Sequence, residues 1–296
     1  MSLLAIAPLL LGTGVCLGLG VPFAKLAAAQ GAGVLLFATL PTAVAGAMLL
    51  LLGLSRAGVP APPAVLLRFG LTAGLLGHAV PMSALYWLTA RAGASFAALA
   101  FTLPAVFTLA IALLLRLEPP TFRRVAAVAL GCAGAALLVL GRGLSFSDDL
   151  TAVLLVVAIP ASIAAGNVYR SRCMPPGVDG DWLSAATLLS SAVMLAGAAA
   201  VAPFPIGSLA GAWHWLAAQA AALVVGYLLY FALQRRAEPV TFSFMGYVSM
   251  LTGVAAGTLM FDEHLPWSTV PALALILMAL LLLNKSPAAV SRIPRS

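Results

Sequence analysis

"LLLRLEPPTFRRV", residues 113–125, separates two long apolar runs with one acid, two prolines and three arginines. Such a cluster of charge and proline is typical of a short polar turn between membrane helices. A second break, "LMFDEHLPWSTV" at residues 259–270, has a similar layout but carries acids and no arginine. The two breaks suggest one kind of turn that the chain uses twice in opposite surroundings.

The rest of the chain consists of apolar runs that are long enough to cross a bilayer. Charged residues make up 8% of the sequence, against about 25% in an ordinary globular protein. About twenty apolar residues cross the hydrocarbon as a helix, and backbone groups in lipid must bond within their own segment. We therefore predict an all-α membrane protein with ten transmembrane helices, at residues 4–24, 32–54, 66–89, 94–116, 122–141, 149–170, 183–203, 213–234, 240–261 and 267–284.

The basic residues predict how the protein faces in the membrane. With ten spans both tails lie on one side, and twelve of the fifteen Lys and Arg residues fall on that side. Short loops rich in Lys and Arg stay in the cytoplasm, so we expect a bacterial inner-membrane protein with both termini cytoplasmic. The net charge of +7 falls in loops, tails and helix ends rather than in a stripe, so nucleic acid is not an expected partner.

The two halves of the chain repeat. When the second half is aligned on the first at an offset of 145 or 144 residues, charged, hydroxyl and aromatic residues coincide with residues of the same kind. The pairs are Glu118 and Glu263, Lys25 and Arg170, Phe37 and Trp182, Thr42 and Thr187, Phe122 and Trp267, Tyr86 and Tyr230, and Arg91 and Arg235. The alternative is that charges gather at the helix ends of any membrane protein. With five spans per half the second half is inverted, so Glu118 is cytoplasmic, Glu263 is external, and only the cytoplasmic turn keeps its arginines. We predict a first repeat at 1–145, a second, inverted repeat at 146–285 and a cytoplasmic tail at 286–296.

Two segments resemble the closing helix pair of each repeat in the drug/metabolite transporter superfamily, in its EamA-type ten-helix branch: "SFAALAFTLPAVFTLAIALLLRLEPPTFRRVAAVALGCAGAALLVLG" (95–141) and, more loosely, "EPVTFSFMGYVSMLTGVAAGTLMFDEHLPWSTVPALALILMALLLLN" (238–284). "GLGVPFAKLA" (18–27) looks like the end of that family's first helix. The resemblance implies export or exchange of small metabolites, often amino acids, through a central cavity formed by helices 1–4 and 6–9. We predict a secondary carrier that works by alternating access and exports amino acids or similar small amphiphilic metabolites. The chain departs from the family at Leu19, where tryptophan is common, and at Pro41, where many members have arginine.

Three polar residues within or at the end of apolar runs are candidates for contacts with cargo. His78 is either a proton carrier or cargo contact, since its charge can change near neutral pH, or a neutral imidazole bonded to a backbone carbonyl near Pro81. Lys25 either snorkels to the outer surface or lines the cavity mouth and meets a substrate carboxylate. Asn167 either ties helices together or contacts the cargo, because a buried carboxamide needs partners.

Aromatic side chains form a second group of candidates. Phe101, Phe244 and Tyr247 lie deep in their spans and could form a wall on which cargo stacks. Tyr86 is a further candidate, although it lies near the outer end of its span, where a residue of the aromatic belt is also expected. Tyr230, near an inner end, is expected in the belt.

The absence of acids from the predicted spans limits the mechanism and the cargo. All eight acids fall in loops, whereas proton- and sodium-coupled carriers usually keep one in the bilayer. This favours a facilitator, or coupling through a histidine. Cationic drugs or nucleobase-like compounds are the alternative cargo, although a permanent cation needs a carboxylate or an aromatic cage.

An intramembrane enzyme is the alternative class. A nucleophile and a base must face each other, but Ser95 and His78 share no motif, so we expect no catalytic residues. The three cysteines lack ligand spacing, and we expect no metal and no cofactor. The expected partners are a small-molecule substrate and the lipid bilayer, and the sequence leaves open whether the protein is a monomer or a homodimer.

Overall fold

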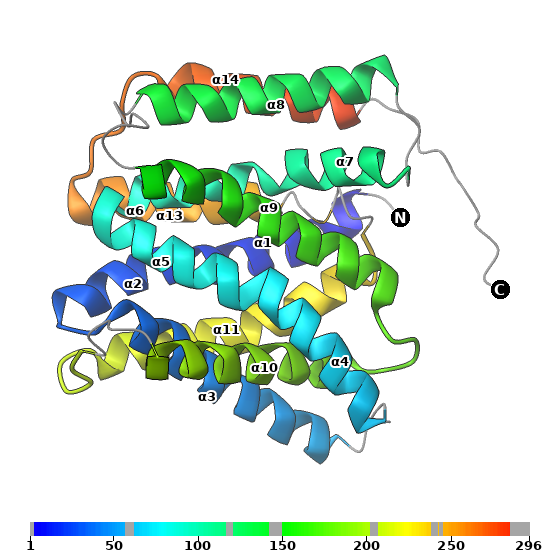
Figure 1. Cartoon of the computed structure of the whole chain (residues 1–296), viewed down its shortest axis with the longest axis vertical. Helices are drawn as coiled ribbons and strands as arrows, with labels where there is room; N and C mark the ends of the chain where they lie inside the picture. The colour runs from blue at the N-terminus through cyan, green and yellow to red at the C-terminus, as the bar shows by residue number, and fades with distance from the viewer. Residues whose placement is uncertain are drawn as a thin grey trace.

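The protein is an assembly of helices (Figure 1). The computed structural model describes residues 3–56, 62–116, 121–141, 150–201, 207–237, 242 and 245–284. The named elements of these residues are all helical, which confirms the predicted all-α class. They are α1 (Leu3–Gly18), α2 (Gly20–Ala29), α3 (Val34–Ser55), α4 (Pro63–Gly74), η1 (Leu75–Ala79), α5 (Val80–Ala92), α6 (Ala94–Leu99), η2 (Ala100–Thr102), α7 (Pro104–Leu114), α8 (Phe122–Gly141), α9 (Leu150–Cys173), α10 (Gly180–Val201), α11 (Trp213–Gln234), α13 (Met245–Phe261) and α14 (Thr269–Asn284).

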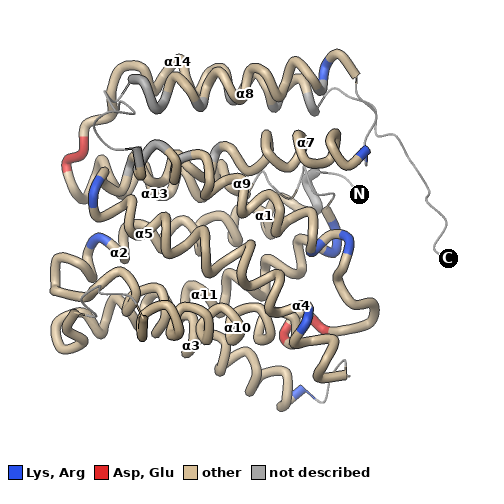
Figure 2. Tube along the Cα trace, in the orientation of Figure 1, with Lys and Arg blue, Asp and Glu red and all other residues tan. Residues whose placement is uncertain are grey.

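The lengths and apolar character of the helices suit a membrane. Six are long and apolar enough to cross one: Ile6–Ala29, Val34–Ser55, Pro63–Ala92, Phe96–Leu114, Gly180–Val201 and Trp213–Gln234. Shorter apolar helices cover Val125–Gly134, Met245–Phe261 and Thr269–Ala279. Figure 2 shows the Lys, Arg, Asp and Glu residues gathered toward the two ends of the bundle, with an uncharged middle. The total of ten spans and their inverted arrangement remain predictions.

Prolines divide two of the predicted spans into shorter pieces. The predicted span 66–89 consists of α4, the π-helical turn η1 and α5, with Pro81 at the start of α5. The predicted span 94–116 consists of α6, the 3-10 turn η2 and α7, which begins at Pro104. A proline has no N–H to give to the preceding turn, so the helix changes its winding there.

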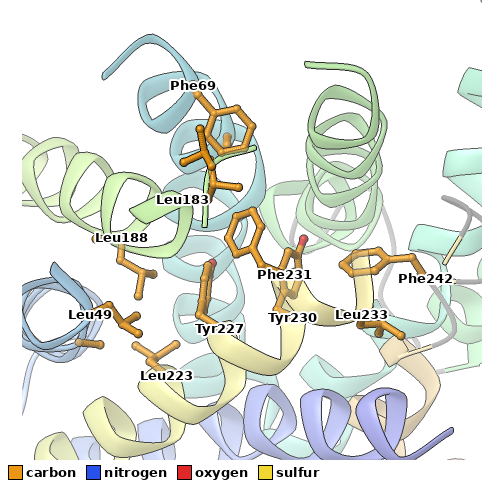
Figure 3. Close-up of a cluster of buried hydrophobic side chains, with 14 of the residues drawn as sticks. Leu49, Phe69, Leu183, Leu188, Leu223, Tyr227, Tyr230, Phe231, Leu233 and Phe242 are labelled. Carbon is orange, nitrogen blue, oxygen red and sulfur yellow. The ribbon is translucent and has the colours of Figure 1, made fainter. Parts of the chain in front are cut away.

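Helices from the two halves of the chain pack against one another. α3 packs on α10 and α11, α1 packs on α11 and α13, and α5 packs on α9. α8 of the first half likewise packs on α14 of the second. Figure 1 shows α8 and α14 together along one edge, and Figure 3 shows the cluster of buried side chains between α3, α4, α10 and α11.

Small residues permit the close contacts, as expected for helices in lipid. A Cβ on Gly18 would lie 2.6 Å from the carbonyl oxygen of Ser249 in α13. One on Gly74 would lie 2.7 Å from the carbonyl oxygen of Thr187 in α10. Both distances are too short for a side chain, so glycine is required where these backbones approach.

Candidate functional site

A cavity lies between the two halves, and we call it the central cavity. It is lined by residues of α1, η1, α5, η2, α7, α9, α11 and α13: Leu17, Gly77, His78, Met82, Tyr86, Phe101, Pro104, Ile163, Asn167, Gln219, Leu223, Tyr227, Tyr230, Met245, Gly246 and Ser249. Its volume is about 40 Å³, which is room for roughly three water molecules. The cavity of this structure is therefore too small to hold an amino acid.

The π-helical turn η1 leaves one carbonyl for another helix to satisfy. Val80 donates its N–H to the carbonyl of Leu75, five residues back, and Pro81 has no N–H. The Leu76 carbonyl thus has neither of the partners that its own helix would normally provide. The Ser162 hydroxyl in α9 donates to it at 2.7 Å.

One face of α9 follows this turn at four-residue intervals. Four residues after Ser162, a Cβ on Gly166 would lie 3.0 Å from the Cα and from the N of Gly77. Four residues further, Arg170 lies against Gly77, where a Cβ would overlap its guanidinium, and its Nη1 donates to the Ala73 carbonyl at 3.2 Å. The residues at i, i+4 and i+8 share a face of a helix, so this spacing places the arginine beside the central cavity.

His78 projects from η1 and is bonded on both sides by hydroxyl groups. Its Nε2 lies 2.9 Å from Thr42 Oγ1, and its Nδ1 lies 3.0 Å from the Tyr227 hydroxyl. Because Thr42 donates its own proton to the Ala38 carbonyl at 2.6 Å, it accepts from a protonated Nε2, and Tyr227 donates to Nδ1. The backbone carbonyl expected near Pro81 is therefore not the partner of this imidazole.

Arg170 lies in the last turn of α9, as the predicted span implies, but it is 1% exposed and therefore buried. α9 ends at Cys173, and the guanidinium of Arg170 points into the protein, toward Ala73 and Gly77. Its Nη2 donates to Asn167 Oδ1 at 2.9 Å, and Tyr230 donates its hydroxyl to the same oxygen at 3.2 Å. The Tyr230 ring lies 5.0 Å from the guanidinium carbon, and the Nε is buried with no hydrogen-bond partner.

The expected aromatic belt is wrong for two tyrosines. Tyr86 and Tyr230 are 4% and 5% exposed, because both side chains face the central cavity. Gln219 donates to the Tyr86 hydroxyl at 3.2 Å, and Phe37 packs edge-on against the Tyr86 ring. Figure 3 shows Tyr227 and Tyr230 rising from α11 on the same side, with stacked rings 5.4 Å apart.

The remaining aromatic candidates fall in different places. Phe101 is buried and lines the central cavity. Tyr247 packs against the cluster around α5, α6 and α13, and it is not among the residues that line the cavity. Phe244 lies outside the described residues, as does Glu118.

Lys25 lies at one end of the molecule, beside a second cavity that we call the end cavity. This cavity has a volume of about 140 Å³ and includes Lys25, Phe37 and Tyr86 in its lining. Lys25 forms an ion pair with Glu263 and lies over the Phe261 ring, and Glu263 also accepts from the backbone N–H of Ala94 at 2.8 Å. The lysine therefore lines the end cavity rather than the central cavity, and it meets a carboxylate of the protein itself instead of one from a substrate.

A second ion pair joins α3 to α10. Arg56 Nη1 lies 3.1 Å from Asp181 Oδ2. Asp181 is in the first turn of α10 and is 8% exposed, although all acids were expected in loops. α10 begins at Gly180, before Asp181. The helix dipole favours a negative charge in the first turn, so Asp181 stabilises this start of the helix.

Several residues of the central cavity were missed as site candidates: Gln219, Tyr227, Tyr230 and Ser249. Gln219 stands out as a carboxamide in an apolar helix, and Tyr230 is the repeat mate of Tyr86. Both signals are present in the sequence. Ser249 carries no such signal, because its hydroxyl bonds to backbone carbonyls as many membrane serines do.

Comparisons with known proteins agree with the fold. Residues 4–140 match the model of the EamA-like transporter family. No curated protein matches the sequence. Among twelve matching chains of solved structures, one described only as "Crystal structure of protein" has a TM-score of 0.63 and 18% identity, over 92% of this chain and 95% of that chain. At that identity the likeness shows a shared fold.

Proposed function

We propose that the chain belongs to the EamA-like transporters of the drug/metabolite transporter superfamily, whose model matches residues 4–140, and that it carries small amphiphilic metabolites, most often amino acids, out of the cell. Members of this family are transporters rather than enzymes, and the apolar helices identify a multi-pass membrane protein. The observation that carries the proposal is the central cavity, which both halves line with aromatic rings and buried polar groups. Binding cavities for small molecules combine these two features.

Two inverted repeats, at 1–145 and 146–285, would form the two halves of the carrier. Among the described residues, Arg116 and Asp262 are the non-glycine residues with positive φ, at 54° and 50°. They follow α7 and α13, near the same place in the two predicted turns. The repeat mates Tyr86 and Tyr230 both line the central cavity. These correspondences support the repeat.

The carrier would lie in a bacterial inner membrane with both termini in the cytoplasm. α1 begins and α14 ends at the same end of the bundle (Figure 1). The excess of Lys and Arg in the loops predicted on that side supports a cytoplasmic position for it.

Alternating access would open the central cavity to one end at a time. Its volume of about 40 Å³ is too small for an amino acid, so the halves must separate to admit cargo. Lys25–Glu263 and Arg56–Asp181 each join an element of the first half to one of the second. Tyr86, which lines both the central and the end cavity, is placed to close the path between them.

Facilitated transport fits the polar groups better than proton coupling does. Both imidazole nitrogens of His78 are bonded to hydroxyls, and the described lining residues include no acid. A buried arginine next to such a cavity disfavours cationic cargo, which was the alternative. No contact in the described residues favours a nucleobase-like compound.

The proposal is tested with purified protein in proteoliposomes, given labelled amino acids and organic cations with and without a pH gradient. We expect amino acids to move down their own gradient, with little effect of pH, and organic cations to stay outside. If no solute moves under any gradient, the protein is not a carrier.

A further inference from the structure

Resting on the proposed function, we propose that Arg170, with Asn167 and Tyr230, forms a subsite for the carboxylate of the cargo. The described lining of the central cavity includes no acid that would match an ammonium group. The cargo class is therefore an amphiphilic carboxylate, and an amino acid would be recognised by its acid end alone.

No acid of the described residues forms an ion pair with Arg170. The two ion pairs within the described part of the chain are Lys25–Glu263 and Arg56–Asp181, and neither includes this arginine. Its bonds go to neutral oxygens, on Ala73 and Asn167. A charge that is 1% exposed is costly to bury without a counter-charge, so an anion that enters beside it gains a large share of its binding from this site.

The guanidinium of Arg170 has the geometry to bind a carboxylate. Nε and Nη2 form one edge of the group, along which a carboxylate can accept two parallel hydrogen bonds. In the structure the Nε of Arg170 has no hydrogen-bond partner. The Nη2 donates to Asn167 Oδ1, an amide oxygen that is a weaker acceptor than a carboxylate. A carboxylate can take both positions, while the amide of Asn167 gives way.

The guanidinium of Arg170 lies directly behind residues that line the central cavity. Gly77, Asn167 and Tyr230 all line it, and all three contact Arg170. Any side chain at Gly77 would overlap the guanidinium, so the arginine reaches the wall only because this residue is glycine. Apolar lining residues such as Phe101, Met82 and Leu223 surround the remaining space and suit an apolar body.

The ammonium group of an amino acid has no acidic partner among the described residues of the cavity. Among the described residues that line the cavity there is no Asp or Glu, so an ammonium group that leaves water finds no carboxylate there. The carboxylate therefore decides affinity, and the ammonium group adds nothing.

Three matched probes separate these contributions: phenylalanine, 3-phenylpropanoate, which lacks the ammonium, and 2-phenylethylamine, which lacks the carboxylate. Binding to the purified full-length protein is measured by the shift in its thermal unfolding. We expect both acids to bind, the propanoate at least as tightly as phenylalanine, and the amine not to bind. Equal binding of the amine, or no binding of either acid, overturns the inference.

Asn167→Asp is the decisive variant, because it supplies a carboxylate to Arg170 from within the protein. We expect this variant to unfold at a higher temperature and to bind 3-phenylpropanoate at least roughly tenfold more weakly. A merely structural Arg170 predicts the higher stability without the loss of binding, and that outcome overturns the inference. Arg170→Gln should likewise lose the acid, whereas Arg172→Gln, at an exposed position of the same helix, should bind it as the wild type does.

The binding readout keeps this inference distinct from the carrier itself. If 3-phenylpropanoate binds to the wild type and not to Asn167→Asp, the subsite is established. If in that case no probe crosses the proteoliposome membrane, the transport function fails and the subsite stands.

Discussion

His78 connects three elements through two hydrogen bonds to hydroxyl groups. Thr42 comes from α3 and Tyr227 from α11, while the imidazole itself projects from η1. A neutral ring with one donor and one acceptor nitrogen satisfies both hydroxyls, whereas a doubly protonated ring would leave Tyr227 without an acceptor. The arrangement therefore favours a fixed, neutral histidine that holds helices together.

His78→Gln tests this at the scale of a residue. We expect the dependence of transport rate on pH, from about 5 to 8, to match that of the wild type. The free energy of unfolding should fall by about 1 to 3 kcal/mol, since buried hydroxyls lose partners. Transport assays across this range and thermal unfolding in detergent measure the two effects, with the exposed His264→Gln as control. A flattened pH profile in His78→Gln alone would instead identify a proton carrier.

The residue types at the site could be predicted from the sequence, but their partners could not. His78, Asn167 and Lys25 stand out because they interrupt apolar runs. Their partners come from other helices, as when Lys25 meets Glu263, 238 positions away. Arg170 lies in the last turn of its helix as expected, but its burial depends on Ala73 and Gly77 of other elements, which no local pattern shows.

At the scale of elements, η1 and α9 form the part of the site that depends most on backbone chemistry. Pro81 has no N–H to donate, and the π-helical turn directs the N–H of Val80 to the Leu75 carbonyl. The Leu76 carbonyl is left without a backbone donor, and the Ser162 hydroxyl donates to it. The prolines in the sequence indicate that helices break, but the choice of a π-helical turn depends on the facing serine. The span was therefore predictable and its winding was not.

Ser162→Ala should lower the free energy of unfolding by about 1 kcal/mol, because the Leu76 carbonyl loses its partner in a medium without water. Ser83→Ala is the matched control, since that hydroxyl bonds only to carbonyls of its own helix, at Ala79 and Val80. Thermal unfolding of both variants in detergent compares them. An equal effect of the two substitutions would contradict the role given to Ser162.

Gly166→Ala should cost more, about 1 to 3 kcal/mol, because the new methyl forces α9 away from Gly77. Gly197→Ala makes the same change on α10, where a Cβ meets nothing within 4 Å. We expect the first variant to unfold at a lower temperature and to lose affinity for cargo, as Arg170 moves with α9. If Gly166→Ala binds and unfolds as Gly197→Ala does, the close crossing is unimportant.

At the scale of the whole molecule, ion pairs join the halves and the central cavity lies between them. Lys25 is paired with Glu263, and Arg56 with Asp181. Part-exposed pairs of this kind contribute little stability, which suits contacts that must break in each transport cycle. The sequence predicts the repeat and the helix order, whereas the small volume of the central cavity depends on packing that no local pattern encodes.

Lys25→Cys combined with Glu263→Cys, joined by a short cleavable thiol reagent, should stop transport, because the two halves can no longer separate at that end. Cleaving the reagent should restore the rate. The background requires Cys16, Cys132 and Cys173 to be replaced by alanine, and each single variant treated with the reagent is a control. Unchanged transport after complete bridging would show that this end does not open.

The central claim, two halves of opposite orientation, is tested most directly by thiol labelling from one side of the membrane. Arg116→Cys and Asp262→Cys, in the same cysteine-free background, report the turns after α7 and α13, which share a positive φ. With a membrane-impermeant maleimide on intact cells, we predict that position 262 is labelled at once and position 116 only after the membrane is permeabilised. Labelling of both positions from the same side would contradict the inverted repeat and the carrier built on it.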